Sequence, residues 1–238
     1  DLLVVSRTNK GLVRDNNEDS ILVKLPNLFA IADGMGGHQG GETASSEAVA
    51  YLAETDFANV AEKNVLPFLA KKVQEASSRI WQMAQENPKL KGMGTTLTVV
   101  YLLDDERACA AHVGDSRIYL LQSNGLKKIT RDHSYVAELV RNKEISPEEA
   151  VNHLHKNIIM RAVGAEPYVE VDTFEFLTSG AKKMLLSSDG LTNMVSEEEI
   201  ENILQDSNLT FAADSLMEKA LAAGGKDNIS FIILDLED

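Results

Sequence analysis

The segment Leu28–Glu42, which reads LFAIADGMGGHQGGE, constrains the fold more than any other stretch of this sequence. An apolar run ends at Asp33, glycines follow, and a segment compatible with a helix continues from them. This order predicts a strand that delivers a carboxylate to the edge of a sheet, with Gly34 letting the backbone approach an ion closely. The Asp33-Gly34 pair taken alone fits a hairpin turn equally well, so its meaning depends on the other acids.

Hydrophobic patterns elsewhere predict groups of strands alternating with groups of helices. Strands are expected at 2–5, 20–25, 28–32, 95–103, 108–113, 117–122, 169–176, 183–187 and 229–234, and helices at 42–52, 60–85, 132–157, from 196 onward and at 211–223. Short connections favour antiparallel strands, and paired helices favour coverage of two stacked sheets. The sequence therefore predicts an α+β sandwich in a single domain, residues 1–238, since no linker or repeat interrupts it.

Composition limits the partners of this chain. Its 23 basic and 37 acidic residues give a net charge of −14, which argues against nucleic acid and anionic membranes as partners. One cysteine and five scattered histidines argue against disulfides and a zinc site. No apolar stretch reaches the roughly 20 residues of a membrane helix, and no signal peptide precedes the first strand. We expect a soluble, cytoplasmic protein, although a start at Asp1 allows a longer or membrane-anchored parent.

Acids adjoin the predicted strands at five places. The acids that follow a strand are Asp33, Asp115 and Asp189, and those that precede one are Glu18, Asp19 and Asp227. In antiparallel sheets the end of one strand neighbours the start of the next, so all of them can reach one edge. Clustered carboxylates repel unless a cation is present, and oxygen ligands suit Mg²⁺ or Mn²⁺.

Such a cluster could hold two ions that share a carboxylate. Two metal ions about 3.5–4 Å apart can produce a bridging hydroxide for in-line attack on phosphorus. Arg14, four residues before Glu18, is placed so that its planar guanidinium could donate two parallel hydrogen bonds to phosphoryl oxygens. The residues thus favour metal-assisted phosphoester hydrolysis.

Seven motifs point to one family. They are VRDNNEDS at 13–20, ADGMGGHQGGE at 32–42, GMGTT at 92–96, HVGDSRIYLL at 112–121, TRDHSYVAELV at 130–140, SSDGLTNMV at 187–195 and GGKDNIS at 224–230. Together they resemble the metal-dependent protein serine/threonine phosphatases of the phosphatase 2C family, in the compact bacterial form. The resemblance implies a four-layer α/β/β/α sandwich, two antiparallel sheets flanked by helix pairs, with Mn²⁺ or Mg²⁺ at one end: two core ions and a possible third.

The resemblance also implies metal-binding roles for five residues. Asp33 matches the carboxylate that bridges the first two ions, and the Gly34 carbonyl matches a ligand of the second. Asp189 and Asp227 match ligands of the first ion. Asp115 matches, together with Asp189, the third-ion site.

Four further residues match positions around the ions and the substrate. Glu18 and Asp19 fall on the acidic pair that holds metal-bound water. Arg14 takes the phosphate-binding position. His38 matches a histidine that could protonate the leaving group, and a solvated loop histidine is the alternative.

Residues 132–164 correspond to the flap, a helical insertion beside the active site of these phosphatases. The sequence departs here from the family pattern: Leu154 and His155 replace a proline-containing run, and the turn at Lys143 lacks a common glycine. Both changes predict a less constrained flap backbone. His133, like His153 and His155, is expected at the flap surface or as a capping residue.

The activity that follows is hydrolysis of phosphoserine or phosphothreonine on proteins, opposing a bacterial Ser/Thr kinase. Three alternatives remain at this point: a dedicated regulator such as an anti-anti-sigma factor as substrate, a small phosphoester as substrate, or an inactive metal- or phosphoprotein-binding module. The expected partners are the phosphorylated substrates and the cognate kinase, and the expected state is a monomer.

Overall fold

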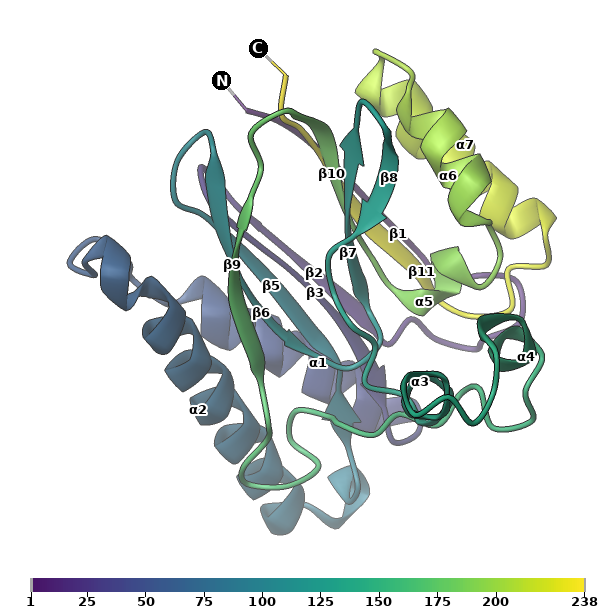
Figure 1. Cartoon of the computed structure of the whole chain (residues 1–238). Coiled ribbons are helices and arrows are strands. Elements are labelled where there is room, and N and C mark those ends of the chain that lie inside the picture. The colour runs from purple at the N-terminus through teal and green to yellow at the C-terminus, as the bar shows by residue number, and fades with distance from the viewer. Residues whose placement is uncertain (1, 238) are drawn as a thin grey trace.

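Two antiparallel β-sheets stack face to face and carry helices on their outer faces (Figure 1). The structure is a computed structural model, and it describes residues 2–237, apart from the side chain of His38. The two described ends of the chain lie close together, because the first and last strands pair along their length. The α+β sandwich expected from the sequence is confirmed.

Every strand pairing within the two sheets is antiparallel. The first sheet has the order β1 (Leu3–Asn9), β11 (Ile229–Asp235), β10 (Ala181–Ser187), β7 (Arg117–Gln122) and β8 (Gly125–Lys128). The second has the order β2 (Asp19–Lys24), β3 (Leu28–Met35), β5 (Leu97–Leu102), β6 (Arg107–Val113) and β9 (Asp172–Leu177), with the short β4 (Gly94–Thr95) pairing with β3. Three of these pairs, β2–β3, β5–β6 and β7–β8, are consecutive in the sequence and are joined by short connections, as expected for antiparallel pairing.

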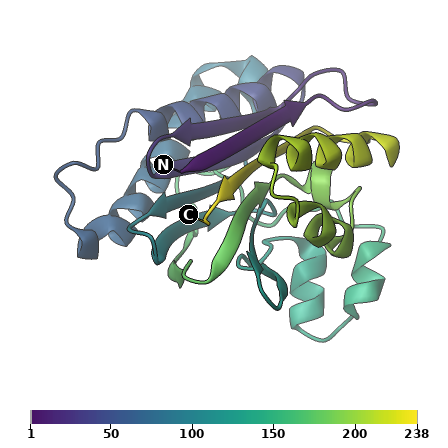
Figure 2. The ribbon, with the colours of Figure 1, turned by 90° about the horizontal axis from the view of Figure 1, so that it is seen from above.

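Helices form the two outer layers. The second sheet is covered by α1 (His38–Ala53) and α2 (Val65–Glu86), with the 3₁₀ turns η1 (Glu62–Asn64) and η2 (Pro88–Leu90) at the two ends of α2. The first sheet is covered by α5 (Asp189–Thr192), α6 (Glu197–Leu204) and α7 (Leu209–Ala222). Two flap helices, α3 (Tyr135–Arg141) and α4 (Pro147–Val151), lie outside the sheets at one end of the sandwich (Figures 1 and 2).

The core has three layers because the central strands are apolar on both faces. In β3, Phe29 and Ile31 are buried between the two sheets, whereas Leu28, Ala30 and Ala32 pack against the α1–α2 layer. This two-residue alternation is that of an extended strand. A strand with both faces covered is expected to read as a continuous apolar run, which is why 28–32 is recognisable in the sequence.

Element boundaries differ from the sequence prediction where local chemistry intervenes. Helix α2 begins at Val65 rather than near residue 60, because Pro67 lacks an N–H and its ring would clash with a preceding helical carbonyl. The expected strand at 95–103 is divided, with Thr96 lying between β4 and β5. The short elements β8 and α5 were not predicted, since four residues carry too little periodicity to identify them.

The flap is helical, as predicted, but consists of two short helices. Ser146 caps α4 in a complete capping box, in which the Ser146 hydroxyl accepts from the Glu149 amide and the Glu149 carboxylate accepts from the Ser146 amide. Ser196 caps α6 with its hydroxyl. Lys143 adopts φ of 60°, the left-handed conformation that the missing glycine would adopt with less strain. Within residues 2–237, no helix is long and apolar enough to span a membrane.

Candidate metal centre

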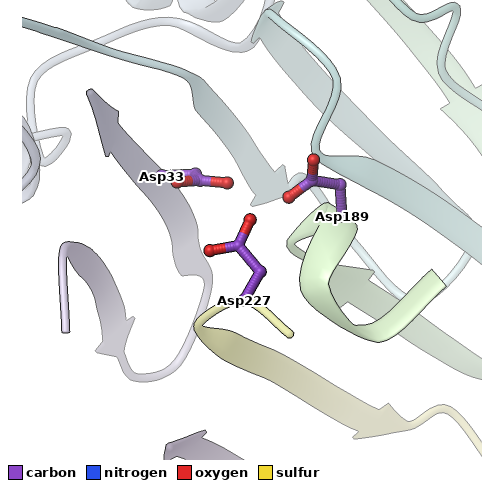
Figure 3. A group of neighbouring side chains, drawn as sticks. All are labelled: Asp33, Asp189 and Asp227. Atoms are coloured by element: carbon purple, nitrogen blue, oxygen red, sulfur yellow. The ribbon is translucent and has the colours of Figure 1, made fainter. Parts of the chain in front are cut away.

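Three aspartate carboxylates converge at one end of the sheets (Figure 3). Asp33 lies near the end of β3, Asp189 opens α5 directly after β10, and Asp227 precedes β11. One carboxylate oxygen from each residue lies within 4.8 Å of the other two. The sheet causes this convergence, because the end of β10 pairs with the start of β11. Three acids that are far apart in the sequence thus meet at one point.

Asp19 joins the group from the neighbouring strand. It stands directly opposite Asp33 in the pairing of β2 with β3. Its Oδ2 accepts a hydrogen bond of 2.7 Å from the Ser230 hydroxyl on β11. Asp19 therefore links the two sheets, because β2 belongs to one and β11 to the other.

Several oxygens in this region have no protein partner. Among the described residues, the buried side-chain atoms without a hydrogen-bond partner are Asp19 Oδ1, Asp115 Oδ1, Asp189 Oδ1 and the Ser187 hydroxyl. A buried polar atom left unpaired costs about 1–3 kcal/mol, and more when the group is charged. Three orphaned carboxylate oxygens at one site fit a cation as the missing partner, and an oxygen-only donor set fits Mg²⁺ or Mn²⁺.

Burial and mutual repulsion raise the pKa values of the clustered carboxylates. Burial raises the pKa of Asp19 to about 7, and the charges of Asp189 and Asp227 add to the shift against the Ser230 hydrogen bond. Burial and the neighbouring carboxylates likewise raise the pKa of Asp33 and of Asp189. Carboxylates that crowd in this way stay ionised at neutral pH when a cation lies among them.

Gly34 and Glu18 connect the acid-bearing strands through their backbones. The Gly34 amide donates to the Glu18 carbonyl over 3.0 Å. A Cβ on Gly34 would lie 1.8 Å from the Gly41 carbonyl oxygen, so only glycine allows β3 and α1 to approach this closely. The Glu18 carboxylate in turn lies against Gly41, near the N-terminal end of α1, where the helix dipole favours negative charge.

Asp115 lies in the turn between β6 and β7 and is 9% exposed. Burial raises its pKa, and the charge of Asp189 is the next largest cause, so the two carboxylates are neighbours. The Ser116 hydroxyl lies 3.0 Å from the Thr96 hydroxyl, which itself accepts from the Asp33 amide over 2.9 Å. These contacts tie the Asp115 turn to the strand that carries Asp33.

Arg14 lies at the rim of the acid cluster. Its Nε is 3.3 Å from Asp227 Oδ1, and 57% of its side chain is exposed. A guanidinium in this position is accessible to a substrate that approaches the carboxylates. His38 is the first residue of α1, and its side chain lies outside the described part of the chain.

Asn228 is a site residue whose role the sequence did not reveal. Its Nδ2 donates to the carbonyls of Lys10 and Asn16, and its Oδ1 accepts from the Glu18 amide, each over 2.9 Å. Asn228 thereby holds the loop that carries Arg14 beside Asp227. Its position directly after Asp227 in the GGKDNIS motif was the available signal.

His133 corrects one sequence expectation, since it is buried rather than at the flap surface. Only 2% of it is exposed, and its ring accepts a hydrogen bond from the Gly114 amide. The expectation was wrong because the polar sequence around it predicted a solvent-facing helix, whereas Thr130, His133 and Ser134 are buried and His133 bonds to the turn after β6. Burial lowers the pKa of His133, which keeps the ring neutral.

The fold and this site together define a class of protein: a two-sheet sandwich with a buried carboxylate centre for divalent cations. Residues 7–223 match the family described as Protein phosphatase 2C. The chain belongs to this family, whose members are metal-dependent.

Relatives match over nearly the full chain. The serine/threonine phosphatase stp of Listeria welshimeri is 43% identical over 237 residues, which cover 96% of this chain and 94% of the relative. The crystal structure of the Mycobacterium tuberculosis serine/threonine phosphatase PstP/Ppp has a TM-score of 0.91 at 39% identity and covers 100% of this chain and 99% of its own. The catalytic domain of a PstP phosphatase in complex with two manganese ions has a TM-score of 0.88 at 39% identity, covering 98% of this chain and 97% of its own.

Proposed function

We propose that this chain is a metal-dependent protein phosphatase that hydrolyses phosphoserine and phosphothreonine. The observation that carries the proposal is the convergence of Asp33, Asp189 and Asp227 within 4.8 Å, beside carboxylate oxygens without protein partners. Family membership and the activity named in its relatives support the same reading.

Asp33, Asp189 and Asp227 would hold two divalent ions, with the Gly34 carbonyl as a further ligand. When bound, two such ions supply a nucleophile at neutral pH and neutralise charge on the phosphoryl group. The manganese complex of the PstP catalytic domain supports Mn²⁺, with Mg²⁺ as the alternative. Asp115 would bind a third ion together with Asp189, and its orphaned Oδ1 supports this assignment.

The remaining residues would bind and orient the substrate or the water around it. Arg14 would hold phosphoryl oxygens, since its guanidinium offers planar, paired donors at the rim of the site. Glu18 and Asp19 would accept hydrogen bonds from water molecules at the centre. His38 remains a prediction as the proton donor to the leaving alkoxide.

The biological setting is also part of the proposal. The substrates would be phosphorylated proteins of a cognate bacterial Ser/Thr kinase, and the chain would act in the cytoplasm as a monomer. Residues 1–238 would form a single domain, in agreement with the continuous layers of buried apolar residues that link both sheets. The flap at 132–164 would govern the access of protein substrates.

Hydrolysis of a phosphothreonine peptide tests the proposal. With Mn²⁺ we expect turnover that EDTA abolishes and that Asp33→Ala and Asp189→Ala each reduce by about 10³-fold, equivalent to about 4 kcal/mol of barrier. Asp214→Ala is the matched control, because Asp214 is an exposed acid on α7 that pairs with Arg7 and lies outside the acid cluster. Activity that survives both site substitutions would contradict the two-metal assignment.

A further inference from the structure

His133 occupies the junction between the flap and the turn that carries Asp115. It stands where the chain leaves β8 for α3, in the segment 130–134 that we call the flap neck. The ring is almost completely buried and lies 4.8 Å, between centroids, from that of His112 on β6. A buried polar ring at such a junction must be held by specific partners.

Both ring nitrogens of His133 have partners. Nδ1 accepts from the Gly114 amide over 2.9 Å, and Nε2 lies 2.7 Å from Asp172 Oδ2 on β9. An amide N–H can only donate, so Nδ1 carries no proton and Nε2–H donates to Asp172. The carboxylate therefore fixes the tautomer and the orientation of the ring that receives Gly114.

The backbone of His133 adds two more links. Its amide donates to the Gly114 carbonyl over 2.8 Å, and its carbonyl accepts from the Met160 amide over 2.8 Å. Gly114 is thus held at both its N–H and its C=O by one residue of the flap neck. It needs this support because its φ is 110°, and a Cβ there would meet the Thr96 side chain at 2.6 Å.

Asp115 lies between two fixed neighbours. Ser116 is attached to Thr96 on one side, and Gly114 is attached to His133 on the other. The Asp115 carboxylate itself ends in a buried oxygen without a partner. The position of this oxygen is set by the turn on either side of it.

We propose that His133 is a positioning residue for Asp115: through its bond to the Gly114 amide it holds the Asp115 carboxylate where a third divalent ion binds. The inference rests on the proposed function, which assigns that ion to Asp115 and Asp189. Asp172 acts indirectly, because its carboxylate orients the imidazole ring of His133. Partners of this kind typically change metal affinity by about 10–100-fold.

Two substitutions separate the bonds of His133. In His133→Asn the side-chain oxygen can take the place of Nδ1 and accept from Gly114, but the link to Asp172 is lost. In His133→Gln the longer amide can reach Asp172, but the Gly114 amide loses its acceptor. Both variants remove one hydrogen bond from the same buried site, so their general effects on stability are matched.

The measurement is Mn²⁺ binding by calorimetry on the full chain, together with kcat and KM for a phosphothreonine peptide. We expect His133→Gln to weaken the third Mn²⁺ by about 10–100-fold and to lower kcat without changing KM, while His133→Asn stays close to the wild type. His112→Asn is the control, since His112 is equally buried but bonds to Thr98 and the Arg131 carbonyl instead.

Several results would overturn the inference. Wild-type affinity for the third ion in His133→Gln, or an equal loss in both His133 variants, would reduce His133 to a packing residue. If His133→Gln does not fold, His133→Leu, which also leaves the Gly114 amide without an acceptor, takes its place, and unchanged affinity there overturns the inference. A wild-type chain that binds two ions but never a third would remove the role of Asp115 and this inference with it, while leaving the two-ion phosphatase proposal intact.

Discussion

The acid cluster and the flap neck lie next to each other but satisfy their buried polar groups in opposite ways. In the cluster, one oxygen each of Asp19, Asp115 and Asp189 has no partner. At the neck, His133 and the adjacent His112 of β6 each use both ring nitrogens. The cluster is complete only with cations, whereas the neck is complete with protein groups alone.

This difference indicates that the acid cluster serves to bind ions, whereas the flap neck serves to stabilise the fold. Carboxylate oxygens left without partners at one point of convergence reduce the stability of the metal-free protein, so their presence there fits a binding role. Groups that satisfy one another stabilise the place where the flap joins the sheets. Substitutions in the two regions should therefore change stability in opposite directions.

The largest expected effect is on the ion pair between Arg117 of β7 and Asp132 of the flap neck. Arg117 makes a two-point contact with Asp132, at 3.2 Å from Nε and 2.8 Å from Nη2, and donates to the Tyr119 hydroxyl over 2.8 Å. We expect Arg117→Met to lower the free energy of unfolding by about 3–4 kcal/mol, because it leaves a mostly buried carboxylate unpaired. Urea denaturation in EDTA measures it.

The control for this prediction is Arg7→Met. Arg7 forms a more exposed pair with Asp214 at 3.3 Å, and loss of such a pair should cost less than about 1 kcal/mol. If the free energy of unfolding falls equally in the two variants, the ion pair of the flap neck stabilises the protein no more than an exposed surface pair does.

A somewhat smaller effect is expected from His112 as the pH falls. Burial, followed by the nearby His133, lowers the pKa of His112 from 6.5 to about 4. The unfolded chain therefore binds a proton below pH 6.5 while the folded chain does not, so His112 removes stability progressively between pH 6.5 and 4 and no further below that. The loss should reach about 2–3 kcal/mol.

Urea denaturation of wild type and His112→Asn between pH 7 and 4 measures this contribution. The stability of the variant, relative to the wild type, should improve as the pH falls through that window. A constant difference across the window would mean that His112 does not titrate as the burial requires.

The smallest expected effect has the opposite sign and lies in the acid cluster. Burial and the charge of Asp227 raise the pKa of Asp189, so its ionisation destabilises the folded metal-free protein above that pKa. We expect Asp189→Asn to raise the free energy of unfolding by about 1–2 kcal/mol at pH 8 in EDTA, and this gain to disappear as the pH falls below 3.8, the pKa of the unfolded carboxyl, where the carboxyl is protonated in both states.

Saturating Mn²⁺ provides the internal control. The ion stabilises the folded wild type by mass action, so with Mn²⁺ the same variant should be less stable than the wild type. A variant that is less stable than the wild type in EDTA as well would contradict the comparison, because Asp189 would then support the fold as the neck residues do.

Most of the fold could be predicted because its strands are long and apolar. The segments at 28–32, 108–113 and 183–187 bury both faces, and the acids at their ends stand out against apolar neighbours. The shortest elements and one turn were not predicted, because their local sequences carry little or misleading signal. Four-residue β8 and α5 have no periodicity to read, and the turn at Lys143 takes a glycine-like conformation that its own sequence disfavours.

The sequence by itself determined the strands, the antiparallel sandwich and the acids that stand at the strand ends, because these follow from local patterns of apolar and charged residues. Only the tertiary structure decided which of these acids meet, that Asn228 holds the Arg14 loop, and that His133 is buried against Gly114. Those contacts join residues between 19 and 218 positions apart, as in His133 to Gly114 and Asn228 to the Lys10 carbonyl. No local pattern encodes such a distance, since it depends on how two sheets and a flap pack together.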